Sequence, residues 1–136
     1  MIDKKNKMPK DFNAYYDRTC KCLLEDNKIE ELIFFKMGVE LKARQDELAA
    51  ITFKQVDLDN LIVTGIESFK EGRIYPSKNI SKEIGDLIKN HLSGSEDEKL
   101  FRKPVTYYKV RIRESNGDEN YSNHMMRHIG QSLYVK

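Results

Sequence analysis

Cysteine is scarce in this chain, since Cys20 and Cys22 are the only two among 136 residues. Small proteins that depend on disulfides carry several pairs, so a disulfide scaffold is excluded. On a helix, a spacing of two residues places the thiols on different sides, which does not suit a shared metal ion. We therefore expect two reduced thiols, at least one of them packed in the core.

Long hydrophobic runs are absent as well. No apolar stretch approaches the roughly 20 residues that are needed to cross a bilayer. Residues 1–10 are rich in Lys and Asn and have no apolar segment behind them, so they do not resemble a secretory signal. We expect a cytoplasmic protein with no membrane partner. Its N-terminus should be flexible over residues 1–10, and residues 11–136 should form one domain.

The chain also lacks an excess of one charge. Its 24 Lys and Arg residues face 22 Asp and Glu residues, which leaves a net charge of +2. This balance is too mild to indicate a nucleic-acid partner by itself. Any DNA-binding face must therefore arise from charges that the fold gathers in space.

The spacing of apolar residues predicts a mostly helical chain. Helices are expected over residues 11–25, 29–37, 44–51, 80–92, 107–114 and 121–134. In the second of these the apolar residues are too dense for one face, so this helix should be central and buried on most sides. Gly38 should mark either its end or a tight approach to a neighbour.

Two short β-favouring runs, residues 61–64 and 73–75, are separated by a turn that contains glycine. They predict a small hairpin, which Pro76 ends because proline has no N–H to extend a ladder. The predicted fold class is therefore mostly α with a small β-hairpin or sheet, an α+β protein.

Three segments carry residues suited to chemistry. The first holds Arg44 and Glu47, three positions apart, so that on one helical face the carboxylate could steady the guanidinium. The second places Lys70 at the tip of the predicted hairpin. The third holds His124 and Arg127, again three positions apart. Taken singly, each segment is typical of an ordinary solvated surface.

His124 also forms a pair with His128, four positions further along the predicted helix. Such a pair can bind zinc on a helix. The glutamate of the metalloprotease motif is missing between them, however, and no third ligand is evident. We therefore expect no metal ion at this pair.

In their order, the segments resemble the tyrosine-recombinase family, which includes the phage integrases. Family members carry an Arg-x-x-Glu-Leu segment after an apolar helix, as at residues 44–48, followed by a stretch similar to residues 52–57. A hairpin then carries a lysine and ends in Arg-x-x-Pro, as at residues 73–76. A Leu-Phe segment and a His-x-x-Arg-His motif follow, as at residues 100–101 and 124–128. The resemblance covers residues 29–130 and implies a tyrosine-recombinase catalytic-domain-like fold.

The resemblance implies catalytic roles in cutting and rejoining DNA strands. Arg44 and Arg127 would hold the scissile phosphate, for which rigid bidentate donors are suited. Lys70 would protonate the leaving 5′ oxygen. Lys78 is a poorer substitute for it, because it follows the proline. His124 would assist proton transfer.

The remaining implied roles lie around that centre. Glu47 would brace Arg44, and Arg73 and His128 would contact DNA. The implied partner is double-stranded DNA, with other recombinase protomers as further partners. Neither a metal nor another cofactor is implied, because a phosphotyrosine bond conserves the energy of the broken linkage.

The family nucleophile is a tyrosine that lies several helical turns beyond the His-x-x-Arg motif. Tyr134 is seven residues after Arg127, which is too close to match it. We therefore expect a catalytic-domain fragment that is incomplete at its C-terminal end, and whether it acts alone as an enzyme stays open. The alternatives are a non-catalytic DNA-binding regulator built on the recombinase fold, or an unrelated helical interaction domain.

Overall fold

The computed structural model describes residues 9–68 and 72–133. In order, these form α1 (Phe12–Glu25), α2 (Ile29–Leu41), α3 (Gln45–Ala49), the 3-10 turn η1 (Phe53–Gln55), β1 (Val56–Asp57), β2 (Ile62–Val63), β3 (Glu67–Ser68), β4 (Arg73–Ile74), β5 (Lys78–Asn79), α4 (Lys82–His91), α5 (Val105–Asn116) and α6 (His124–Leu133). The chain is mostly helical with small antiparallel sheets, so the predicted α+β class is confirmed. None of the described helices combines the length and apolar character needed to cross a bilayer.

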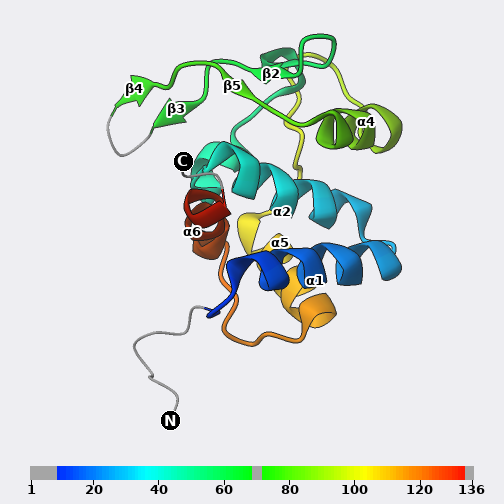
Figure 1. The fold of residues 1–136 in the computed structure, drawn as a ribbon. Helices are drawn as coiled ribbons and strands as arrows, with labels where there is room; N and C mark the ends of the chain where they lie inside the picture. The colour runs from blue at the N-terminus through cyan, green and yellow to red at the C-terminus, as the bar shows by residue number, and fades with distance from the viewer. Residues whose placement is uncertain (1–8, 69–71, 134–136) are drawn as a thin grey trace.

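Helix α2 is the centre of the structure. Its sequence is apolar on all sides, and Ile33, Phe34 and Phe35 have no exposed surface. It packs against α1 and α5, against α4, and against α6 (Figure 1). Phe34 stacks on Tyr108 of α5, with ring centroids 4.3 Å apart. The prediction of a central helix buried on most faces is therefore confirmed.

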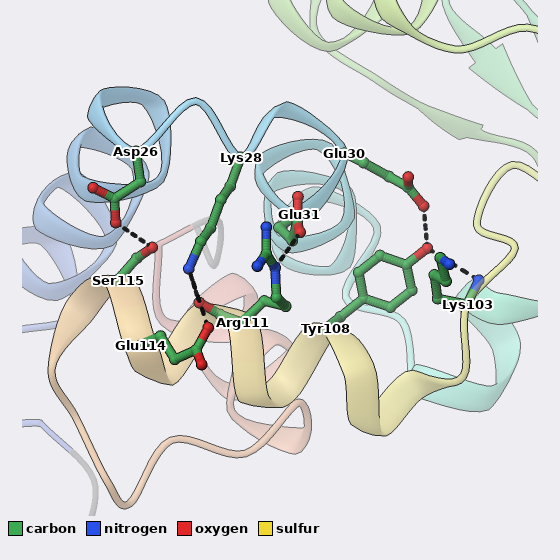
Figure 2. A network of polar contacts seen from close by, with 9 residues as sticks. All are labelled: Asp26, Lys28, Glu30, Glu31, Lys103, Tyr108, Arg111, Glu114 and Ser115. Carbon is green, nitrogen blue, oxygen red and sulfur yellow. Dashed lines mark hydrogen bonds and ion pairs between the residues drawn. The ribbon is translucent and has the colours of Figure 1, made fainter.

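Polar contacts join the N-terminal end of α2 to α5 (Figure 2). Arg111 Nε donates to Glu31 Oε2 at 2.8 Å, and Lys28 Nζ donates to the Arg111 carbonyl at 3.0 Å. The Tyr108 hydroxyl donates to Glu30. Glu31 is almost fully buried, so removal of its arginine partner would leave a buried charge uncompensated. These contacts fix how α5 lies on α2.

Two glycines let α6 lie directly against the C-terminal half of α2. A Cβ atom on Gly130 would come within 2.1 Å of the Val39 carbonyl oxygen, and one on Gly38 within 2.3 Å of the Met126 sulfur. At Gly130 the clash is with the backbone of α2, so a side chain there requires movement of the helices, whereas at Gly38 it requires the Met126 side chain to move. Of the two interpretations of Gly38, the tight approach is right, since α2 continues to Leu41.

The strands pair differently from the prediction. β2 pairs antiparallel with both β1 and β5, whereas β3 pairs with β4. The hairpin predicted between residues 61–64 and 73–75 is therefore wrong. Gly65, with φ +70°, ends the first run and turns the chain, so that the partner of β4 is the following segment. Pro76 separates β4 from β5, in agreement with its predicted role as a strand end.

The last helix begins later than predicted, at His124 and not at Tyr121. Tyr121 is fully buried before the helix starts, and its hydroxyl donates to Asn123 Oδ1 at 3.0 Å. Just before it, Asp118 Oδ1 accepts from the Asn120 backbone N–H at 2.9 Å, and side-chain bonds to the backbone of this kind compete with helical ones. The predicted end of the helix at residue 134 lies outside the described residues.

The two cysteines are free thiols, as predicted. Cys20 is half-buried and packs against the core. Burial raises the pKa of its thiol to about 11, so that the group stays protonated at neutral pH. Cys20 is therefore an inert part of the packing between helices.

We predict that Gly130→Ala lowers the free energy of unfolding by about 1–3 kcal/mol, the usual cost of forcing an extra methyl group into a packed contact. On an exposed helix the same change would stabilise by about 1 kcal/mol, because alanine is the better helix former. Chemical denaturation of wild type, Gly130→Ala and the exposed neighbour Gln131→Ala measures the difference. Stability equal to or above wild type in Gly130→Ala would contradict the close approach of α2 and α6.

Candidate functional site

The end of α2 and the start of α6 lie together. Helix α2 ends at Leu41, and Lys42 takes a left-handed conformation with φ +53°, which turns the chain toward α3. Arg44 follows as the residue that precedes α3, in an extended conformation with ψ 153°. On the other side, a Cβ on Gly130 of α6 would lie 3.0 Å from Lys42 Cγ. The contact between the two helices thus brings the Arg44 segment to α6.

A buried amide links the two segments directly. Asn123 is 2% exposed and stands just before α6. Its Nδ2 donates to Gln45 Oε1 at 3.1 Å and to the Val105 carbonyl at 2.8 Å. Gln45 follows Arg44 and Asn123 precedes His124, so this bond holds the first and third predicted segments side by side. Asn123 was overlooked in the sequence, where nothing separates it from other turn-forming asparagines.

The structure brings together four of the predicted residues, Arg44, His124, Arg127 and His128, which we call the cationic cluster. Partial burial lowers the pKa of His124, and the positive charges of His128, Arg44 and Arg127 lower it further. The Nε2 atoms of His124 and His128 are 2.9 Å apart. His124 is exposed, whereas the other three are half-buried.

Arg44 contributes an unused donor to this cluster. Its Nε atom is buried and has no hydrogen-bond partner within the described part of the chain. Leaving a buried donor unpaired costs about 1–3 kcal/mol, and more for a charged group. A phosphate could satisfy this donor once the Arg44 side chain moves to expose it, because Nε and a terminal nitrogen together fit two oxygens of a phosphate.

Glu47 supports Arg44 through the main chain. Because Arg44 lies outside α3, Glu47 Oε1 accepts from its backbone N–H at 3.0 Å, in the manner of a capping box. The expectation that the two residues share one helical face, with the carboxylate on the guanidinium, is therefore wrong. The Glu47 carboxylate is buried, and Oε2 accepts from the Tyr75 hydroxyl at 3.4 Å. It thus joins α3 to the segment after β4.

Lys78 of β5 reaches the same place from the sheet. Its Nζ donates to the Leu41 carbonyl at 2.5 Å and lies 4.7 Å from the centre of the Tyr75 ring. The pKa of Lys78 is lowered from its ordinary value. Burial is the largest cause, the negative charge of Glu47 opposes the shift, and the positive charge of Arg127 adds to it. In the sequence Lys78 ranked below Lys70 because it follows Pro76. The register of β5 is what directs it toward the end of α2.

The β3–β4 hairpin meets the cluster at its base, since Tyr75 directly follows β4 and contacts Glu47. Arg73 lies on β4 and is exposed. Lys70 belongs to the segment between the two strands and lies outside the described residues.

Comparison with family models, curated proteins and solved structures finds no match for this chain. Across residues 9–68 and 72–133, no group of three or more His, Cys, Asp or Glu residues is placed to hold a metal ion. The cationic cluster and its immediate surroundings are therefore the part of the molecule that bears on function.

We predict that Arg44→Gln raises the pKa of His124 toward its ordinary value, because loss of a nearby positive charge makes protonation of the ring less costly. NMR titration of the imidazole signals would follow all three histidines. The signal of His91, which is exposed on α4, serves as the internal control. If the pKa of His124 did not move, the guanidinium would be too distant to belong to one site with it.

Proposed function

We propose that this chain is the greater part of a phage-type tyrosine-recombinase catalytic domain, which places a phosphodiester of duplex DNA on the cationic cluster. The observation that carries the proposal is that the positive charges of Arg44 and Arg127 both act on His124 and lower its pKa. These residues come from segments far apart in the sequence that stand in the family's order. The helical core with small sheets is compatible with the tyrosine-recombinase-like fold that we propose with this function.

The chemistry of strand transfer suits such a cluster. Transesterification at a phosphodiester builds negative charge on the two non-bridging oxygens. Arg44 and Arg127 stay protonated at any physiological pH and offer paired donors to those oxygens. His124 has a lowered pKa and is therefore mostly neutral near pH 7, so its ring can accept a proton and pass it on.

The other cations add to the positive field at this phosphate. By the resemblance, Lys70 would protonate the leaving 5′ oxygen from the segment between β3 and β4. Lys78 would strengthen the field from the side of β5, close to Arg127. Arg73 and His128 would contact neighbouring parts of the DNA. The reaction needs no energy-supplying cofactor, because the covalent protein–DNA link conserves the energy of the broken bond.

The nucleophile is assigned to a tyrosine that follows α6 in the family's order, supplied by the same polypeptide or by another protomer. The hydroxyls of Tyr15, Tyr108 and Tyr121 donate to Asp118, Glu30 and Asn123. Burial raises the pKa of all three phenols. These tyrosines therefore serve the core, and an attacking phenol must reach the phosphate in line with the leaving oxygen.

We predict weak binding of duplex DNA that falls steeply with salt, because contacts to phosphate release counterions. Arg44→Gln and Arg127→Gln should each weaken binding about tenfold or more, since a hydrogen bond to a charged group contributes about 1.5–3 kcal/mol. Fluorescence anisotropy with a labelled duplex at low salt measures both effects. Lys21→Gln, a loss of charge at an exposed site on α1, is the matched control. Equal weakening in all three variants would show that the cationic cluster does not contact the DNA.

We also predict that the 136-residue protein forms no covalent adduct with a nicked suicide substrate. The physical reason is position. The hydroxyls of Tyr15, Tyr108 and Tyr121 are bound to Asp118, Glu30 and Asn123, and Tyr134 follows Arg127 by only seven residues, which is too close to match the family nucleophile. A denaturing gel would reveal an adduct as a shifted protein–DNA band. Supplying a tyrosine-bearing helix as a peptide should produce the band only while Arg44 and Arg127 are intact. Appearance of the band with the peptide separates a recombinase from a DNA-binding regulator.

A band formed by the chain alone would contradict this assignment of the nucleophile. Tyr75 and Tyr134 are the residues to change in that case. Tyr75 contacts Glu47 at the edge of the cluster, and Tyr134 lies outside the described residues. Loss of the band in Tyr75→Phe or in Tyr134→Phe would identify that tyrosine as the nucleophile.

A further inference from the structure

We infer that His124 and His128 form a binding site for one divalent late transition-metal ion, with Cu²⁺ favoured over Ni²⁺ and Zn²⁺. The two rings stand on consecutive turns of α6, with centroids 4.5 Å apart and planes at 81°. Their Nε2 atoms face each other at 2.9 Å. This inference goes beyond the proposed function and departs from the expectation that the pair holds no metal.

The separation of the two nitrogens matches the coordination of a tetragonal ion. With a metal–nitrogen bond of about 2.0 Å, two neighbouring ligands at a right angle lie about 2.8 Å apart, and at the tetrahedral angle about 3.3 Å apart. The observed 2.9 Å is close to the first value. Tetragonal geometry with nitrogen and oxygen ligands is typical of Cu²⁺ and Ni²⁺, whereas zinc prefers a tetrahedron.

The helix prepares this arrangement before any ion arrives. The opposite face of α6 is buried through Met125, Met126 and Ile129, which fixes its backbone. At 2.9 Å one ring nitrogen must accept from the other, so at least one of them already carries a lone pair directed into the gap. The ring that donates frees its own Nε2 lone pair when its proton moves, by exchange with solvent, to Nδ1 of the same ring. Water can complete the coordination from the solvent side.

The neighbouring cations decide which ions can bind. Arg44 and Arg127 repel any metal ion held by the two rings, so the metal–imidazole bonds must outweigh that repulsion. Imidazole binds Cu²⁺ most strongly among the divalent first-row ions, and Mg²⁺, Ca²⁺ and Mn²⁺ prefer oxygen ligands. The site should therefore discriminate against those three ions.

The test is a titration of the full chain with CuCl₂, followed by calorimetry and by NMR of the imidazole signals. We expect one ion per chain, with paramagnetic broadening of His124 and His128 before His91. His124→Ala and His128→Ala should each weaken binding at least tenfold, because a single imidazole cannot chelate. His91→Ala, which removes the exposed histidine of α4, should leave the affinity unchanged. Circular dichroism verifies that each variant is folded.

Broadening of all three histidines together, or full affinity in either single variant of the pair, would overturn the site. A second variant tests its position beside the arginines. Arg44→Gln should tighten Cu²⁺ binding several-fold while it weakens DNA binding, because the same charge repels one ligand and attracts the other. Weaker Cu²⁺ binding in this variant would also overturn the inference. Since the two ligands are assayed separately, failure of the metal site and failure of the DNA-binding proposal are distinguishable.

Discussion

The close contact between α2 and α6 is the constraint on which the rest of the site depends. Gly38 and Gly130 remove the side chains that would hold the two helices apart. Helix α2 is buried on most sides, so its position is fixed by the core and it can serve as a support for α6. A wider separation would move Arg127 and the two histidines away from the turn that carries Arg44.

Gathering several positive charges at one place opposes folding, and the structure shows how this cost is reduced. Glu47 lies buried beside Arg44 and also influences Lys78. Lys78 donates to a carbonyl at the C-terminal end of α2, where the helix dipole is negative. His124 has a lowered pKa and so carries little charge near neutral pH. The buried Nε of Arg44 remains without a partner in the described part of the chain, and a side-chain movement would have to expose it before an anion could bind it.

The two proposed ligands use different properties of the same residues. A phosphodiester is held by the guanidinium groups of Arg44 and Arg127, with the N–H groups of the histidines as additional donors. A metal ion instead requires the lone pairs of His124 and His128 and is repelled by the guanidinium groups. Loss of one arginine should therefore weaken DNA binding and tighten metal binding. Because the two responses are opposite, the two ligands can be studied independently.

Periodicity in the sequence determined the mostly helical class and the central position of α2, because apolar spacing reports directly which face of a helix is buried. It left two interpretations of Gly38 open, and the packing of α6 decided for the tight approach. The order of motifs also singled out Arg44, His124 and Arg127. Tertiary structure decided the partner of β4, because two-residue strands carry too little pattern to specify register. It also placed Arg44 before α3, directed Lys78 to the end of α2, and gave Asn123 its bond to Gln45. Each of these features depends on residues that are distant along the chain, and their contacts form only when the helices pack.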